Sequence, residues 1–170
     1  MPVKNPKELF VSMLSHVRQH TERAAAIYKE LGEKAQNPEI QEALSARALV
    51  SQQDLQKLDE VFKMIGEQPV NVTGRLQEIF LEDFRKEVAE IQSPEARRIF
   101  VLAKANHLSH LRTAEYAALV AAADVTGNYG AGVLLESCMA DHLAFAERTR
   151  RLIRRIVETK ILARAAGATG

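Results

Sequence analysis

Histidines are the residues of this 170-residue chain whose type and spacing come nearest to a metal-binding pattern. His16 and His20 lie four residues apart, and His107 and His110 lie three residues apart. Either spacing places two imidazoles on one side of a helix, an arrangement compatible with zinc, copper or iron. The alternative, which we favour, is that His16, His20 and His107 lie at the polar boundary of their helices and bind no metal.

The remaining histidine, His142, lies one turn from Cys138 and Phe145 on an apolar helix face. We therefore predict a core histidine bonded to a neighbouring side chain or backbone group. Cys138 lies next to Met139 within an amphipathic segment, where a thiol is usually an inert packing residue. No Gly-x-Ser-x-Gly motif is present, and the glycines of 127–132 do not follow a strand, so no nucleophilic or phosphate-binding loop is expected. No catalytic residue is predicted.

Composition excludes several classes of protein. The formal net charge of +1 gives no long-range attraction for nucleic acid or for an anionic membrane. The single cysteine cannot form an intramolecular disulfide, which favours the cytoplasm or another reducing compartment. The first twenty residues lack a secretory signal, and no apolar stretch is long enough to span a membrane. We expect neither nucleic acid nor a membrane as a partner.

Proline and glycine divide the chain into long helical blocks. Asn-Pro at 5–6, Asn-Pro at 37–38 and Ser-Pro at 93–94 each supply an N-cap side chain followed by proline at the first helical position. Gly32, Gly66 and Gly127 fall where a left-handed residue would end the preceding helix. Apolar residues recur at three- and four-residue steps within each block. The predicted helices are 6–31, 38–65, 74–92, 94–126 and 132–166.

These helices are too long for a globin-like packing and predict an extended bundle. Short connections between the first and second helices and between the fourth and fifth require antiparallel neighbours, and the long connection 65–94 contains its own helix. The fold class is therefore all-α, a ferritin-like antiparallel four-helix bundle with an additional short helix in the long crossover. One domain covers residues 1–170, and residues 166–170 are expected to be frayed.

A ferritin-like bundle with a di-metal site needs inward glutamates on two helices and a Glu-x-x-His motif on each of the other two. Glu-x-x-His occurs nowhere in the chain. The apolar faces instead present Thr21, Val50 to Asp54, Ser109 to Arg112, and Asp141 with His142. We therefore expect neither a metal nor a cofactor. The alternative is a rearranged site for iron, manganese or zinc, built from His142, His110, Asp141, Asp54 and Glu22.

Arg112 has two interpretations. Its heptad position points it inward near Asp54, Asp141 or Glu22, where a buried ion pair would take the place of a metal and serve specificity more than stability. In the other interpretation, Arg112 lies at the edge of the apolar stripe and its head reaches solvent.

The last predicted helix is basic and amphipathic. Its arginines could contact an acidic protein partner or an anionic surface, although arginines near a helix C-terminus also favour the helix dipole. No aromatic platform for nucleic-acid bases accompanies them. The apolar stripe of this last helix continues to Leu162, which favours self-association. In the predicted helix 94–126, small alanine side chains would allow another helix to pack closely, either within the bundle or across a dimer. The arginines are Arg148, Arg150, Arg151, Arg154 and Arg155, and the alanines are Ala114, Ala117, Ala118, Ala121, Ala122 and Ala123.

Several fragments, taken in order, resemble one known group of proteins. They are Glu8-Leu9-Phe10, Leu58-Asp59-Glu60-Val61-Phe62, His110 with Ala114-x-Tyr116, and Gly127-Asn128-Tyr129 followed by Leu134-Leu135. The chain resembles the bacterial YciE/YciF-like group of ferritin-like stress proteins over nearly its whole length. The resemblance implies the ferritin-like fold, a homodimer and a stress context.

The same resemblance implies where metal-binding carboxylates would lie. The corresponding positions fall at or beside Thr21 and Glu22, Val50 with Asp54, Ser109 with Arg112, and His142 with Ala146, so nearly every ligand carboxylate is replaced. We therefore expect a non-catalytic bundle with a structural or interaction role that has lost its di-metal ligands. The alternative is a metal-binding oxidoreductase or metal-storage protein with the rearranged His/Asp site.

Overall fold

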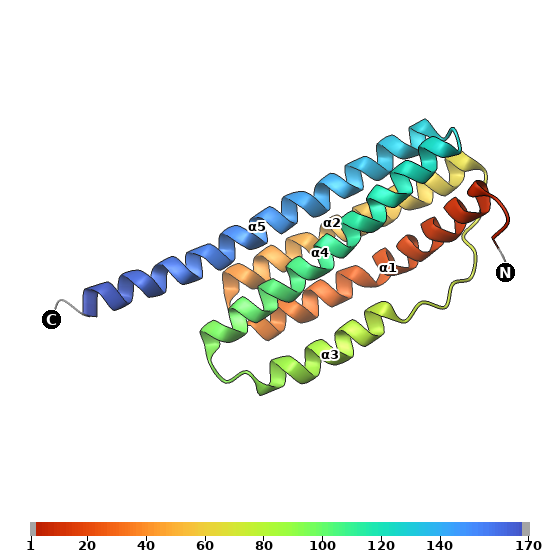
Figure 1. Cartoon of the computed structure of the whole chain (residues 1–170). Coiled ribbons are helices and arrows are strands. Elements are labelled where there is room, and N and C mark those ends of the chain that lie inside the picture. Colours follow the sequence, from red (N-terminus) through yellow and green to blue (C-terminus); the bar gives the residue numbers. More distant parts are fainter. Residues whose placement is uncertain (1–2, 168–170) are drawn as a thin grey trace.

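The computed structural model describes residues 3–167, and within them the chain forms five α-helices and no strand. The helices are α1 (Pro6–Ala35), α2 (Pro38–Ile65), α3 (Leu76–Glu90), α4 (Pro94–Val125) and α5 (Tyr129–Gly167). Four of them run side by side as a long bundle, and the short α3 lies on its outside (Figure 1). This arrangement confirms the all-α class and the additional helix in the crossover.

Three of the five predicted helix starts, those at residues 6, 38 and 94, are confirmed by their N-caps, whereas the third helix starts at Leu76 and not at residue 74. The side chains of Asn5, Asn37 and Ser93 accept hydrogen bonds from backbone amides in the first turns of α1, α2 and α4, and proline follows each of them. Two of the predicted ends are also confirmed, because Gly66 and Gly127 adopt positive φ values of 68° and 73°.

The predicted end of the first helix is wrong. Gly32 lies inside α1, which continues to Ala35, and Gln36 forms the left-handed cap with φ 51°. A Cβ atom at Gly32 would lie 3.4 Å from Gln41 Cα and 3.4 Å from Leu44 Cβ, so this glycine allows α1 and α2 to approach closely. The last helix also begins earlier than predicted, at Tyr129 and not at residue 132.

The connections fix which helices are neighbours. Two residues separate α1 from α2 and three separate α4 from α5, so each pair forms an antiparallel hairpin. The two hairpins pack through α1 against α4 and α2 against α5, which leaves α2 and α4 diagonal to each other. The crossover from α2 to α4 carries α3, which contacts α1 and α4 (Figure 1).

The core consists of two apolar clusters, one toward each end of the bundle. One contains the C-terminal half of α1, the start of α2 and the first half of α4, together with α3 and Phe145 and Leu152 of α5. The other contains the first half of α1, the end of α2, the end of α4 and the start of α5. Buried polar residues lie between the two clusters, at mid-height of the four long helices. In this central layer, polar groups from all four long helices lie close enough in the interior to act together.

The C-terminal part of α5 extends beyond the body of the bundle (Figure 1). Ile161 and Leu162 in this extension are exposed at 59% and 70%. The helix continues to Gly167, and residues 168–170 of the segment expected to be frayed lie outside the described part of the chain. Among the described helices, none is both long and apolar enough to cross a membrane.

Candidate site at the bundle centre

The central layer is built from polar and charged side chains of all four long helices. Thr21 of α1, Arg47 and Asp54 of α2, Arg112 of α4 and His142 of α5 are each at most 6% exposed. Charged side chains are rarely buried to this degree unless they are paired, because removal from water is costly. The partners of these groups therefore determine what the centre can do.

Arg47 connects two helices. Its Nη2 donates to Asp54 Oδ2 over 3.1 Å and to the imidazole of His142, whose Nε2 lies 2.7 Å and whose Nδ1 lies 3.0 Å from it. The guanidinium also lies over the ring of Tyr28, 5.6 Å from its centroid. Sequence reasoning missed this residue, although Arg47 lies midway in a heptad series from Ile40 to Asp54 and therefore on the inward face of its helix.

The contact with Arg47 requires a neutral His142. Burial, together with the nearby charges of Arg47 and Arg112, lowers the pKa of His142 to about 2. The neutral imidazole of His142 therefore accepts a hydrogen bond from the Arg47 guanidinium. This agrees with the predicted core histidine that is bonded to a neighbouring side chain. Burial raises the pKa of Asp54, although the charge of Arg47 and its hydrogen bond to the carboxyl oppose the rise.

Arg112 is 1% exposed, so the inward interpretation is confirmed and the solvent-edge interpretation is wrong. Its partner is Glu115 on the same helix, whose Oε2 lies 2.6 Å from Nη1, and not the expected Asp54, Asp141 or Glu22. The pair is close but poorly aligned.

Within the described chain, Nε, Nη1 and Nη2 of Arg112 all lack a hydrogen-bond partner. Burial lowers the pKa of this guanidinium. Two cations, Arg47 and Arg112, thus lie in the central layer, each beside one carboxylate.

The five residues of the alternative metal site are only partly brought together. His142 Nε2 and Asp54 Oδ2 lie 3.9 Å apart. Asp141 is half-buried at the edge of this pair, where its Oδ2 lies 2.9 Å from Lys57 Nζ. The other two members, Glu22 and His110, are exposed.

The central residues do not fit a di-metal centre. A metal cluster needs several carboxylate or imidazole ligands around one point, whereas this layer holds two guanidinium groups. Across residues 3–167, no group of three or more His, Cys, Asp or Glu side chains could hold a metal ion.

Within residues 3–167, the pair His16 and His20 belongs to no group of three or more His, Cys, Asp or Glu side chains that could hold a metal ion. His20 is 6% exposed, so its placement at a polar boundary is wrong, and its Nδ1 lies 3.4 Å from Glu115 Oε1. His16 is half-buried beside it, with the two ring centroids 6.2 Å apart. His107 is exposed.

Cys138 provides no nucleophile. The thiol is free and 1% exposed, and burial raises its pKa to about 12. A thiol in this state stays protonated and unreactive at neutral pH. Tyr116 is also buried, and burial raises the pKa of its hydroxyl well above its usual value.

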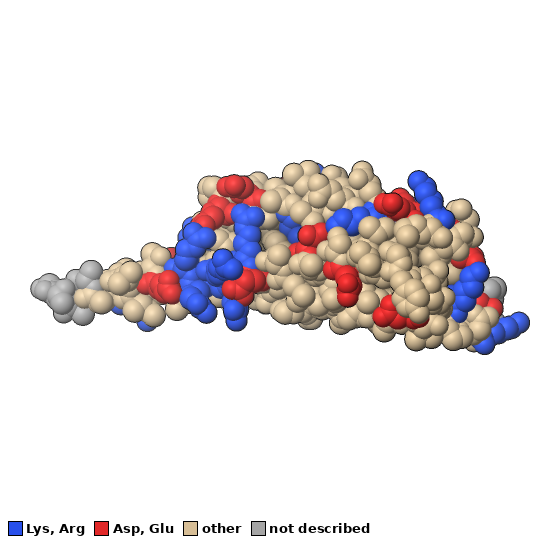
Figure 2. All heavy atoms as spheres, turned by 90° about the horizontal axis from the view of Figure 1, so that it is seen from above, with Lys and Arg blue, Asp and Glu red and all other residues tan. Residues whose placement is uncertain are grey.

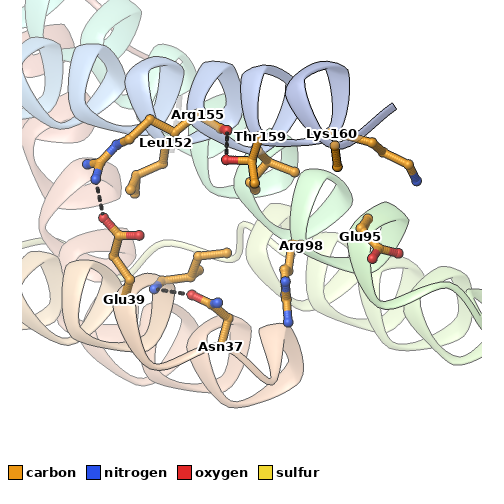
Figure 3. A pocket seen from close by; sticks show the side chains of 11 residues that line it. Asn37, Glu39, Glu95, Arg98, Leu152, Arg155, Thr159 and Lys160 are labelled. Carbon is orange, nitrogen blue, oxygen red and sulfur yellow. Dashed lines mark hydrogen bonds and ion pairs between the residues drawn. The ribbon is translucent and has the colours of Figure 1, made fainter. Parts of the chain in front are cut away.

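A second polar region lies where α5 leaves the bundle. Figure 2 shows Lys and Arg side chains gathered there with a few carboxylates, whereas charges are sparse over much of the remaining surface in this view. An open groove runs beneath this part of α5, between the starts of α2 and α4 (Figure 3). Arg155 crosses its edge to Glu39, with Nη1 2.7 Å from Oε1. Leu152 and Ile156 form part of its apolar wall.

Comparison with known proteins agrees with this fold. Residues 5–162 match the family described as Domain of unknown function (DUF892). No curated protein matches the chain.

Solved structures give the same result. The stress protein YciF of Escherichia coli superposes with a TM-score of 0.87 at 18% identity, over 92% of this chain and 99% of that one. YcfI of Rhodopseudomonas palustris, described as a candidate structural protein, gives 0.78 at 20% identity, over 87% and 94%. Symerythrin of Cyanophora paradoxa gives 0.67 at 16% identity, over 92% and 88%. The chain is therefore similar in fold to ferritin-like helical bundles.

Proposed function

The chain belongs to the DUF892 family, and from this premise we propose that it is a non-catalytic ferritin-like bundle with a structural or interaction role in a stress response. The stress context is carried over from the similarity to YciF, which is described as a stress protein. The similarity to YcfI supports the structural role. The free buried thiol of Cys138 is consistent with a cytoplasmic location.

The observation that carries the proposal is the position of Arg47. Its guanidinium lies at the point where α2 and α5 face each other, within 3.1 Å of Asp54 and 2.7 Å of His142. A divalent cation bound by this carboxylate and imidazole would be adjacent to a fixed positive charge, which disfavours binding. Arg112, fully buried on α4, adds a second repelling charge. The centre therefore supports a rigid, metal-free bundle.

The proposal is tested by thermal unfolding with and without metal. A ligand that binds only the folded state raises the melting temperature, and the rise grows with the logarithm of its free concentration relative to its Kd. We expect the same melting temperature in EDTA, in Mn²⁺, in Zn²⁺ and in anaerobic Fe²⁺. His142→Ala serves as the control, because a real site would lose any metal-dependent shift in that variant. A rise in melting temperature with one metal in the wild type, absent from His142→Ala, would overturn the proposal.

The alternative function is that of a metal-binding oxidoreductase or metal-storage protein, in which a metal ion binds where Asp54 and His142 meet. Their approach to 3.9 Å, with Asp141 nearby, is the observation that favours it. It requires Arg47 to move away so that the imidazole and carboxylate are free to bind. The same thermal experiment separates the two, because this alternative predicts a metal-dependent shift.

The arginine-rich part of α5 is the place where we propose an acidic protein partner would bind. Arg148 and Arg154 are exposed there, and guanidinium groups recognise carboxylates through two parallel hydrogen bonds. A polyglutamate peptide should bind at low salt and lose affinity as salt is raised. The double variant Arg148→Gln/Arg154→Gln should bind more weakly. Binding that is unchanged by both salt and the substitutions would contradict this assignment.

A further inference from the structure

The groove beneath the C-terminal part of α5 exists because this helix continues past the body of the bundle. Its underside spans the gap between the starts of α2 and α4 (Figure 1, Figure 3). The groove has a volume of about 490 Å³. Small-molecule sites are concave and have volumes of about 300–1,000 Å³, so the groove has the size of a ligand site.

One wall of the groove is apolar. Leu152, Ile156 and Ala163 lie on one side of α5, because they are separated by four and seven residues. Thr159 lies between them and donates its hydroxyl to a backbone oxygen one turn earlier, over 2.8 Å, so this hydroxyl already has a partner. Ile40 lines the groove from α2. Ile156 is half-buried and therefore keeps apolar surface that a ligand would cover.

The charged residues that line the groove leave one positive charge in excess. Three of them are cations and two are carboxylates, so their sum is +1. A ligand with a single negative charge balances this excess, whereas the two carboxylates would repel a more highly charged anion such as phosphate. The cations are Arg98, Arg155 and Lys160, and the carboxylates are Glu39 and Glu95.

Both carboxylates already have partners within the protein. Glu39 Oε1 lies 2.7 Å from Nη1 of Arg155. Glu95 accepts a hydrogen bond from Ser93 Oγ over 3.1 Å. The pKa of Glu95 is lowered first by a hydrogen bond from its own backbone amide, then by the bond from Ser93, and less by nearby cations. Each carboxylate also lies in the first turn of a helix, where a negative charge is favoured.

Arg98 is the cation of the groove whose donors remain unused. It is half-buried, and within residues 3–167 its Nε is buried without a hydrogen-bond partner. In Figure 3, Arg98 comes from α4 and lies across the groove from α5. A buried donor without a partner is unfavourable, and a guanidinium binds a carboxylate through two parallel hydrogen bonds. Arg98 is therefore placed to bind the acidic group of a ligand.

We propose that this groove binds a small monocarboxylate with an apolar chain, of the medium-chain fatty acid class. The carboxylate of the ligand pairs with Arg98, and its hydrocarbon chain lies against Ile156 and the rest of the apolar wall. Lys160 adds a second positive charge at the rim. The inference depends neither on whether the bundle centre binds metal nor on an acidic protein partner at Arg148 and Arg154.

The first test is calorimetric titration with hexanoate, octanoate and decanoate, each below the concentration at which it forms micelles. Affinity should rise by about two- to fourfold for each added methylene group, because the chain is removed from water. Octylamine has the same chain as octanoate but the opposite charge, and it should bind at least about tenfold more weakly. Failure of all three acids to bind, or equal binding of octylamine and octanoate, would overturn the proposal.

The second test uses a matched pair of variants. Arg98→Gln should weaken octanoate binding by about tenfold or more, because it removes the charged donor of the pair. Arg148→Gln is the control, since Arg148 is exposed on the same helix as the apolar wall but does not line the groove. It should bind octanoate as the wild type does, and unchanged melting temperatures would show that both variants are folded. Equal affinity of Arg98→Gln and the wild type would contradict the site.

The third test locates the ligand without any substitution. Octanoate added to ¹⁵N-labelled protein should shift the backbone amide resonances of Ile156 and Thr159, which line the groove. Resonances of the far end of the bundle, around Gly127, should stay unchanged. Shifts that occur elsewhere and leave the groove residues unaffected would overturn the assignment.

Discussion

The guanidinium of Arg47 donates a 2.7 Å hydrogen bond to Nε2 of His142, joining α2 to α5 across the bundle centre. The same nitrogen lies 3.1 Å from Asp54 Oδ2. The buried guanidinium of Arg47 is thus hydrogen-bonded to a carboxylate and to an imidazole. The stability of the bundle therefore depends on these three side chains, whereas in a metal-binding bundle the carboxylate and the imidazole would be metal ligands.

Removing the carboxylate alone should destabilise the protein strongly. Asp54→Ala leaves Arg47 buried without its anionic partner, and breaking a buried pair in this way costs about 3–5 kcal/mol of unfolding free energy. Urea unfolding followed by circular dichroism measures the loss. The matched double variant Arg47→Met/Asp54→Leu removes both charges and should recover most of that loss. Equal stability of the wild type and Asp54→Ala would show that the pair is not buried as described.

Arg112→Met should be far less harmful than Arg47→Met. No nitrogen of Arg112 makes a hydrogen bond within the described chain, and the side chain of its partner Glu115 retains 22% exposure. Replacing Arg112 therefore removes a poorly satisfied buried charge and leaves a carboxylate with access to water. We expect a change within about 1 kcal/mol, or a gain. A loss comparable to that of Arg47→Met would contradict this asymmetry between the two arginines.

Stability should fall on mild acidification because of His142. Its pKa is lowered from 6.5 to about 2 in the folded protein, so below pH 6.5 the unfolded chain binds a proton that the folded chain does not. The contribution is fully present above the unfolded pKa and is lost as pH falls, by about 1.4 kcal/mol per pH unit. Between pH 7 and pH 5 this amounts to about 2 kcal/mol.

The control for this pH dependence is His142→Asn, which cannot titrate. Urea unfolding at pH 7 and pH 5 should show a smaller loss in this variant than in the wild type. Asp54 acts in the opposite direction, because its raised pKa favours proton uptake by the folded state at acid pH. The difference between wild type and variant therefore isolates His142, and identical pH dependence of the two would refute the assignment.

Cys138 should be protected from thiol reagents in the folded protein. The thiol is 1% exposed and its pKa is raised to about 12, so thiolate is scarce and inaccessible at pH 8. Labelling with a chromogenic disulfide should be slow in buffer and immediate in guanidinium chloride, with one thiol per chain. Fast labelling of the native protein would mean that this part of α5 opens readily.

Most of the fold could be predicted from the sequence because its signals are local. An N-cap followed by proline at Asn5, Asn37 and Ser93 fixes where three helices start, and short connections fix the antiparallel hairpins. The end of α1 could not be predicted, because whether Gly32 ends a helix or allows close packing depends on the approach of Leu44 from α2.

The central layer was predicted only in part. Thr21, Asp54 and His142 fall on inward helix faces that periodicity identifies, whereas for Arg112 periodicity is compatible with both an inward and a solvent-edge position. Their pairing could not be predicted, because it depends on side-chain direction and on the relative height of neighbouring helices. Arg47 was missed for the same reason, since a long cation on an amphipathic helix usually reaches solvent.

The measurement that tests the central claim most directly is the metal content of untagged protein purified from medium supplemented with iron and manganese. The account predicts less than about a tenth of a transition-metal ion per chain, because the two buried guanidinium groups repel cations from the carboxylate of Asp54 and the imidazole of His142. One to two ions per chain, lost in His142→Ala, would contradict the account and establish the metal-binding alternative.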